Sequence, residues 1–153
     1  GADGAIVVDL PPEEDAPLRA AFAAHDLAVI RLATPTTDDA RLLKVLESAS
    51  GFVYYVAVAG VTGANAASAS SIRTAVERLK RATSLPIVVG FGVREPNAAH
   101  AIALTADGVA VGTAFVDEIA GGGNGSPAER VLRKVKLLSD AVRTARELEG
   151  TSP

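Results

Sequence analysis

The sequence of 153 residues has no cysteine, methionine or tryptophan, and it has only two tyrosines and two histidines. Without cysteine the chain can form no disulfide bond, thiol nucleophile or cysteine-bound zinc site. No apolar run is long enough to cross a bilayer, and nothing resembles a signal peptide. A net charge of −3 gives no general attraction to nucleic acid or anionic membranes. We therefore expect a soluble, cytoplasmic protein with no nucleic-acid and no membrane partner.

What is present is an apolar share of 48%, which is enough to build a real core in a chain of this length. We expect residues 1–153 to form a single domain, with a glycine-rich break at 121–126 before the last helix. Because the chain has no methionine, Gly1 is not a translation start, and we expect a segment upstream of it.

Five short runs rich in β-branched residues predict strands. They are Ala5–Asp9, Leu27–Leu32, Phe52–Val58, Pro86–Gly90 and Gly108–Gly112. The runs are mostly continuous rather than alternating, which is typical of strands in a parallel sheet.

Segments with helical periodicity separate these strands. The first is predicted from Pro11 to about His25, with a solvated acidic first turn at 13–15. Thr36 or Thr37 is expected to cap the second helix. The third is expected to begin at a serine cap at 70 or 71, and the fourth is a short helix over 95–104.

A short apolar segment follows the last strand, and a long helix ends the chain. Ser126-Pro127-Ala128-Glu129 has the form of a capping box and predicts where that helix begins. The charged run 130–136 is interpreted as its solvent-facing side. His25 and His100 are interpreted as surface or packing residues.

The alternation of strand and helix fits two α/β architectures. One is an open, doubly wound sheet of five strands; the other is part of a (β/α)8 barrel, which normally needs eight units. The number of strands favours the open sheet, whereas the loops favour the barrel.

The loops after the fourth and fifth strands have the composition of a phosphate site. In barrels, phosphate is often held by the loops after the last two strands and by the N-terminus of a short helix. Gly90-Phe91-Gly92 ends the fourth strand and Gly112-Thr113 ends the fifth. Glycine lets backbone N–H groups approach an anion closely, while Thr113 adds a hydroxyl and Phe91 an apolar wall.

A third glycine loop, Gly60-Val61-Thr62-Gly63, follows the third strand and leads into a small, polar stretch over 64–71. That stretch has the composition of a mobile lid. Each loop alone is also explained by the needs of a turn. The dinucleotide pattern G-x-G-x-x-G is absent after the first strand, which argues against a dinucleotide site.

Four motifs carry a family resemblance. GADGAIVVDLPPEE, FVYYVAVAGVTGA, LPIVVGFGV and DGVAVGTAFVDEI resemble, in order and spacing, the C-terminal part of the tryptophan synthase alpha subunit family. The resemblance implies a TIM barrel, present as a partial barrel of about five βα units plus a C-terminal helix. It implies a lyase of tryptophan biosynthesis that cleaves indole-3-glycerol phosphate to indole and glyceraldehyde 3-phosphate. It also implies a beta-subunit partner that carries pyridoxal phosphate, so no cofactor and no metal site is expected in this chain.

The same resemblance assigns the binding residues. Those that match phosphate positions, or lie beside them, are Gly63, Gly90, Phe91, Gly92, Gly112 and Thr113, where Thr113 replaces the usual serine. Tyr54 matches a tyrosine of the substrate pocket, Thr62 a threonine of the closing loop, and Ile6 an apolar residue against the indole ring. Asp9 matches the loop near the surface that meets the beta subunit.

The resemblance also places the family's catalytic pair before Gly1, as a glutamate on the second barrel strand and an aspartate in the loop after it. The reaction needs two positioned carboxylates, because the indole ring gains a proton while the glycerol hydroxyl loses one. Asp9 is a weak catalytic candidate, since capping or loop structure explains it better. Asp107 precedes its strand and so lies at the wrong end of a barrel. The chain alone is therefore expected to be inactive.

A partial barrel leaves two open sheet edges. A missing N-terminal barrel segment or a second copy is expected to cover them. Two alternative functions remain open: a non-catalytic phosphate-binding or assembly module, and another phosphate-binding barrel such as indole-3-glycerol phosphate synthase or phosphoribosylanthranilate isomerase. The GVTGA and DLPPEE motifs disfavour those other barrels.

Overall fold

The structure is a computed structural model that describes residues 1–57, 69–90 and 92–149. Strands and helices alternate along it, as the sequence predicts. The strands are β1 (Gly4–Ile6), β2 (Ala28–Ala33), β3 (Val53–Val56), β4 (Ile87–Gly90) and β5 (Gly108–Val109). The helices are the 3-10 turn η1 (Pro12–Glu14), α1 (Ala16–Ala23), α2 (Asp39–Glu47), α3 (Ala69–Ala82), α4 (Pro96–Ala103), α5 (Thr113–Ala120) and α6 (Pro127–Glu149).

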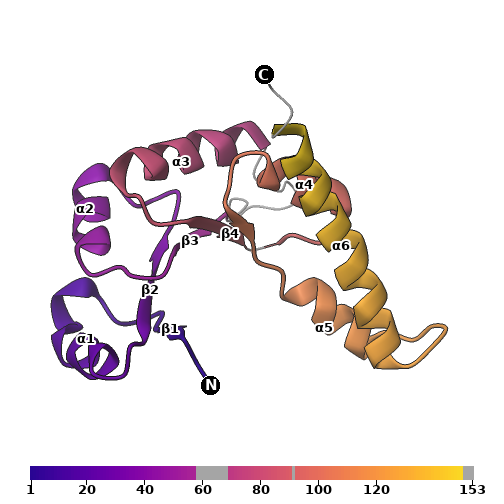
Figure 1. The fold of residues 1–153 in the computed structure, drawn as a ribbon, viewed down its shortest axis with the longest axis horizontal. Coiled ribbons are helices and arrows are strands. Elements are labelled where there is room, and N and C mark those ends of the chain that lie inside the picture. The colour runs from indigo at the N-terminus through magenta and orange to yellow at the C-terminus, as the bar shows by residue number, and fades with distance from the viewer. Residues whose placement is uncertain (58–68, 91, 150–153) are drawn as a thin grey trace.

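The strands form one parallel sheet in the order β1-β2-β3-β4-β5. A doubly wound sheet reverses its strand order at a switch point, and this sheet does not. Right-handed connections that always advance in one direction place their helices on the same side of the sheet. Figure 1 shows the helices as an arc around the strands. The partial barrel is therefore confirmed, and the open doubly wound sheet is wrong.

The core lies between the strands and this arc of helices. Val53 and Ile87 on neighbouring strands are fully buried, as is Val76 of α3. Ile72 and Leu79 flank Val76 at helical spacing and pack into the same cluster. The apolar stripe of α3 thus packs into the core together with the strands.

The first predicted helix is divided in two. A continuous helix would place the ring of Pro17 against the carbonyl of residue 13, and Pro17 has no N–H to donate there. The chain instead forms η1 and then restarts as α1 at Ala16. The helix also ends at Ala23, before His25, and Asp26 adopts a left-handed conformation with φ of 55°.

The two strands at the edges of the sheet are shorter than the sequence predicts. β1 ends at Ile6 rather than at Asp9, and Val7 and Val8 beyond it are 43% and 71% exposed. β5 ends at Val109, although the Ala110 amide still donates to the Val89 carbonyl at 2.8 Å. Among the described residues, β1 and β5 each pair with a single neighbour, which gives these strands less support.

The helix caps were predicted with mixed success. Asp38, not Thr36 or Thr37, caps α2 by accepting a hydrogen bond of 2.7 Å from the Arg41 amide. α3 begins at Ala69, just before the two predicted serine caps. The capping box of α6 is confirmed, since the Ser126 amide donates to Glu129 Oε2 at 2.7 Å and the Glu129 amide to Ser126 Oγ at 3.3 Å. Across the described ranges, no helix is long and apolar enough to span a membrane.

Candidate functional site

A pocket of about 330 Å³ lies at the carboxyl ends of β3, β4 and β5. Its lining residues come from β3, from the loops after β4 and β5, and from the first residue of α5; they are Tyr54, Gly92, Val93, Arg94, Ala110, Val111, Gly112 and Thr113. Four of the predicted site residues therefore meet in space: Tyr54, Gly92, Gly112 and Thr113. In a barrel this is the end of the strands at which active sites lie.

The parallel register brings these residues together. Tyr54 pairs with Val88 across β3 and β4, and Val88 pairs with Gly108 across β4 and β5. The loops that follow the strands therefore lie together at the carboxyl ends of the strands. The loop after β5 is short, because α5 begins at Thr113 directly after its N-cap, Gly112.

The N-terminus of α5 forms part of the pocket wall. The Gly112 carbonyl accepts from the Phe115 amide at 2.9 Å and from the Val116 amide at 3.3 Å, so the helix is well formed from its first turn. The first amides of a helix have no acceptor within the helix. Together with the helix dipole, they create a favourable position for an anion.

Two of the glycines leave space at the pocket. A Cβ atom built on Gly92 or on Gly112 would meet nothing within 4 Å. Gly92 also has φ of +77°, a left-handed conformation that favours glycine. A ligand can therefore approach the backbone closely at both positions.

Gly90 does not line this pocket, and its place beside the phosphate positions stays a prediction. It is buried. A Cβ atom there would lie 2.0 Å from Tyr54 Oη and 3.0 Å from the Ala110 Cβ. Packing of the Tyr54 ring is thus sufficient to explain this glycine.

The two tyrosines of β3 point to opposite faces, as the alternation along a strand predicts. Tyr54 is half-buried and lines the pocket. Tyr55 lies in the core at 6% exposure, and burial raises the pKa of its hydroxyl.

Arg94 lines the pocket and was missed by sequence reasoning. It forms an ion pair with Asp117 of α5, and both side chains are about half exposed. The position of Arg94 two residues after Gly92, in a loop after a strand, was the signal available. A single arginine in a loop is ordinarily a surface residue, so the signal was weak.

The other predicted site residues are not brought to this pocket. Thr62, Gly63 and Phe91 lie outside the described residues. Ile6 is 38% exposed on β1, at the opposite edge of the sheet from β5, and does not line the pocket.

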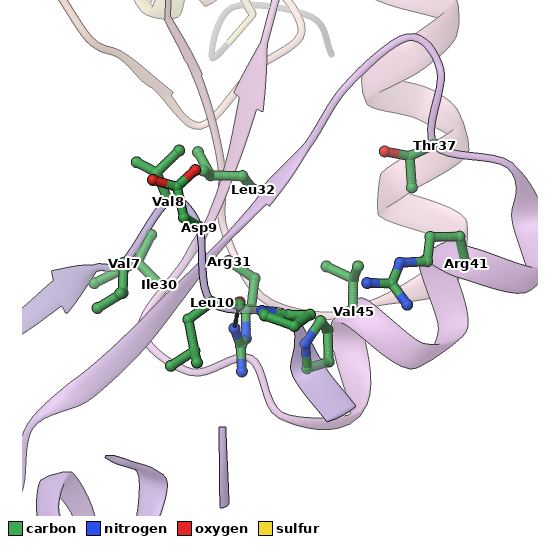
Figure 2. Close-up of a pocket in the computed structure, with 12 residues that line it drawn as sticks. Val7, Val8, Asp9, Leu10, Ile30, Arg31, Leu32, Thr37, Arg41 and Val45 are labelled. Carbon is green, nitrogen blue, oxygen red and sulfur yellow. Dashed lines mark hydrogen bonds between the residues drawn. The ribbon is translucent and has the colours of Figure 1, made fainter. Parts of the chain in front are cut away.

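Asp9 lies at a second pocket of about 380 Å³, at the carboxyl ends of β1 and β2. Figure 2 shows the Asp9 carboxylate next to Val8, turned away from Arg31 and Arg41. Asp9 is exposed on the loop that follows β1. Its surroundings agree with the interpretation of Asp9 as a loop residue.

Beneath that second pocket lies a buried ion pair between Asp15 and Arg31, which are 0% and 5% exposed. Arg31 also donates to Ser48 Oγ at 3.0 and 3.2 Å and to the Leu10 carbonyl at 3.2 Å. Asp15 accepts a further bond of 2.7 Å from Arg19 Nε. Burial lowers the pKa of the Arg31 guanidinium. The interpretation of Asp15 as a solvated first-turn residue is therefore wrong. Sequence reasoning could not find its partner, because Arg31 on β2 is distant in sequence.

The remaining candidates have structural roles. His100 Nδ1 lies 3.0 Å from the Ala141 carbonyl, which joins α4 to α6. The Asp107 carboxylate accepts a hydrogen bond of 2.8 Å from the Ile87 amide and forms an ion pair of 3.0 Å with Lys80. It lies at the amino ends of the strands, as predicted. In the part of the chain that the structure describes, no group of three metal-ligating side chains is present.

A parallel sheet whose strands follow one another in chain order, with a pocket at the carboxyl ends of the strands, defines a protein of the TIM-barrel class. The family model described as "Tryptophan synthase alpha chain" matches residues 1–147. The chain therefore belongs to the tryptophan synthase alpha chain family.

Individual relatives agree with this assignment. The tryptophan synthase alpha chain of Caulobacter vibrioides is 54% identical over 148 residues, which are 95% of this chain and 54% of that protein. That of Erythrobacter litoralis is 54% identical over 146 residues, 95% of this chain and 56% of that protein. The crystal structure of tryptophan synthase subunit alpha from Legionella pneumophila superposes with a TM-score of 0.81 at 32% identity, covering 94% of this chain and 53% of that one. The chain thus spans about half the length of the relatives it matches.

Proposed function

We propose that this chain carries the substrate-binding half of a tryptophan synthase alpha-type lyase. The reaction is the cleavage of indole-3-glycerol phosphate to indole and glyceraldehyde 3-phosphate, in tryptophan biosynthesis. The observation that carries the proposal is the pocket at the carboxyl ends of β3, β4 and β5, with the N-terminus of α5 in its wall. Family membership supports the class of reaction, and the pocket supports the part that these residues play in it.

In this proposal the pocket holds the phosphate group of the substrate. The backbone at Gly92 and Gly112 is accessible because neither residue has a side chain and a Cβ would enter open space. Thr113, the first residue of α5, supplies a hydroxyl donor. Tyr54 from β3 adds an aromatic wall on the side of the organic part of the substrate. Thr62, Gly63, Phe91 and Ile6 remain predicted contacts.

We further propose that these residues bind the substrate without cleaving it. Among the described residues that line the pocket, none carries a carboxylate. The cleavage needs an acid and a base within hydrogen-bond distance of the substrate, and Asp9 lies at a different pocket. A complementary barrel segment would supply the acid and the base, and it would cover the open edges of the sheet. A second copy of this chain is the other partner that fits those edges.

The proposal also includes the partners of the family. The beta subunit would accept the indole and would hold the pyridoxal phosphate, so this chain itself would carry no cofactor. Both proteins would act in the cytoplasm.

An assay of indole release from indole-3-glycerol phosphate tests the proposal. The chain is assayed alone and after mixing with the separately produced N-terminal half of the Caulobacter alpha chain. We expect no release from the chain alone and measurable release from the mixture. The substitution Thr113→Val in this chain should reduce release from the mixture, whereas the exposed Lys136→Ala serves as a control. Robust release from residues 1–153 alone would contradict the proposal.

A further inference from the structure

The phosphate pocket contains one positive charge that the family resemblance does not assign. Within the described part of the chain, Arg94 is the one charged residue among those that line the pocket. The other polar groups there are backbone amides and the hydroxyls of Tyr54 and Thr113. A phosphate ester carries close to two negative charges at neutral pH, so neutral donors alone leave most of that charge uncompensated.

The Arg94 guanidinium forms an ion pair with the Asp117 carboxylate. Asp117 is on α5, four residues after Thr113. At a rise of 1.5 Å per residue, this places the backbone of Asp117 about 6 Å along the helix from its first residue. The ion pair therefore keeps the guanidinium near the first turn of α5, where the proposed phosphate would lie.

The same ion pair also affects the field at the pocket. A free carboxylate at Asp117 would repel an anion bound at the N-terminus of α5, over a distance shorter than the screening length in physiological salt. Arg94 offsets this charge, and it is the nearer of the two charges because it lines the pocket whereas Asp117 does not. Because both side chains are about half exposed, the guanidinium is also accessible to a ligand and is a suitable bidentate donor to phosphate oxygens.

We propose that Arg94 is a phosphate-binding residue of this pocket. This inference rests on the proposed function, because it assumes that the pocket takes a phosphorylated substrate. It adds a charged side chain to a site otherwise made of glycines, an aromatic ring and a hydroxyl. It also predicts that phosphate binding depends on ionic strength, as expected for a contact between exposed charges.

Calorimetric titration of the chain with inorganic phosphate tests this inference. The variants are Arg94→Ala, Asp117→Asn and the double variant with both changes. Arg78→Ala is the matched control, because Arg78 pairs with Asp39 on the surface of α3 and α2 and does not line the pocket. It removes the same charge from the chain as Arg94→Ala does.

We expect Arg94→Ala to weaken phosphate binding about fivefold to tenfold, the range for losing one partly exposed charge-assisted hydrogen bond. Asp117→Asn should bind phosphate at least as tightly as the unaltered chain, and Arg78→Ala should bind it equally. In the double variant, binding should remain weaker than in Asp117→Asn alone. Arg94→Lys should restore part of the affinity, which separates loss of charge from loss of fold.

Three outcomes would overturn the inference in different ways. If the double variant binds as well as Asp117→Asn, Arg94 acts only by neutralising Asp117 and does not bind phosphate. If Arg94→Ala binds as well as the unaltered chain, Arg94 has no role, while the proposed function stands. If the unaltered chain does not bind phosphate, the proposed phosphate pocket fails and the role of Arg94 fails with it.

Discussion

At the scale of single residues, the ion pair between Asp15 and Arg31 is a buried contact between segments that are distant in sequence. Both side chains are almost entirely buried, and their pairing joins the start of α1 to β2. Removal of one partner leaves an uncompensated charge in the interior, which typically costs about 3–5 kcal/mol. The pair therefore fixes the geometry of the loop after β1, because Arg31 also binds the Leu10 carbonyl.

We expect Asp15→Asn to lower the free energy of unfolding by about 3 kcal/mol or more. The neighbouring Glu14→Gln is the control, since Glu14 is exposed and its change should stay within about 0.5 kcal/mol. Urea denaturation followed by circular dichroism measures both. Equal stability of the two variants would show that Asp15 is not paired in the interior.

Gly90 gives a second prediction at this scale. In Gly90→Ala the new methyl group would overlap the Tyr54 hydroxyl, so the ring must move out of its place. We expect a loss of about 1–3 kcal/mol in unfolding free energy, as for overpacking elsewhere. Gly122→Ala is the control, because a Cβ at Gly122 meets nothing within 4 Å. If Gly90→Ala is as stable as Gly122→Ala, the Tyr54 ring does not pack closely against Gly90 of β4.

At the scale of elements, Arg130 joins two helices. Sequence reasoning placed it on the solvent-facing side of α6, and this is wrong. Its guanidinium donates to the carbonyls of Glu118 at 2.9 Å, Gly121 at 2.6 Å and Gly125 at 2.7 Å. A side chain from the next helix thus caps the C-terminal end of α5 and also binds the loop that follows it.

We expect Arg130→Ala to destabilise the chain by about 1–2 kcal/mol, because several carbonyls lose a charged donor. Lys136→Ala, on the exposed side of the same helix, should change stability by less than about 0.5 kcal/mol. Amide hydrogen exchange adds a local readout, since protection should fall first in α5. Unchanged protection of α5 in Arg130→Ala would contradict the capping role.

Asp107 joins α3, β4 and β5, and it gives a pH dependence. Burial alone would raise its pKa, but the hydrogen bond from the Ile87 amide and the nearby Lys80 ammonium hold the pKa below its usual value. A carboxyl whose pKa is lower in the folded state stabilises the fold above its unfolded pKa of about 3.9. That stabilisation is lost as the pH falls through the folded pKa.

The unfolding free energy should therefore decrease below about pH 4, and part of this decrease should be absent in Asp107→Asn. Urea denaturation at pH 3 to 7 measures the slope. Because Asp107 is 41% exposed, the difference between the two chains should be small, under about 1 kcal/mol. A slope that is identical in Asp107→Asn would show that this carboxyl does not contribute.

The order and type of the elements could be predicted from the sequence because they depend on local patterns. Apolar runs gave the five strands, and Ser126 with Glu129 gave the start of α6. The break at Pro17 was missed, although the residue itself signals it. The pairing of Asp15 with Arg31 and the capping by Arg130 could not be read locally, because each joins segments that only the fold brings together.

At the scale of the whole molecule, the sheet formed by the described residues is open at both edges. β1 and β5 each have one neighbour among the described strands. Large apolar side chains are exposed on β1 and the loop after it, and on the two helices that follow β5 in the chain; they are Ile6, Val7, Val8, Val116, Ile119, Leu132, Val135 and Leu137. The relatives that the chain matches are about twice as long. An open edge and exposed apolar side chains at both ends are the features expected where further barrel units pack.

At the candidate site too, residues in local motifs could be predicted, whereas a residue placed by distant contacts could not. Glycines at strand ends and the serine-like Thr113 could be predicted as a set, because parallel strands end at one edge of the sheet. Tyr54 joins them through the register of β3. Arg94 has no motif of its own, and only the position of α5 beside its loop shows that it belongs to the pocket.

The most direct measurement is a titration of the isotopically labelled chain with inorganic phosphate, followed through its backbone amide resonances. The structure predicts saturable shifts at Gly92, Gly112 and Thr113, with little change at Asp9 in the second pocket. No shift at these three amides, or larger shifts at the second pocket, would contradict a phosphate site at the carboxyl ends of β4 and β5.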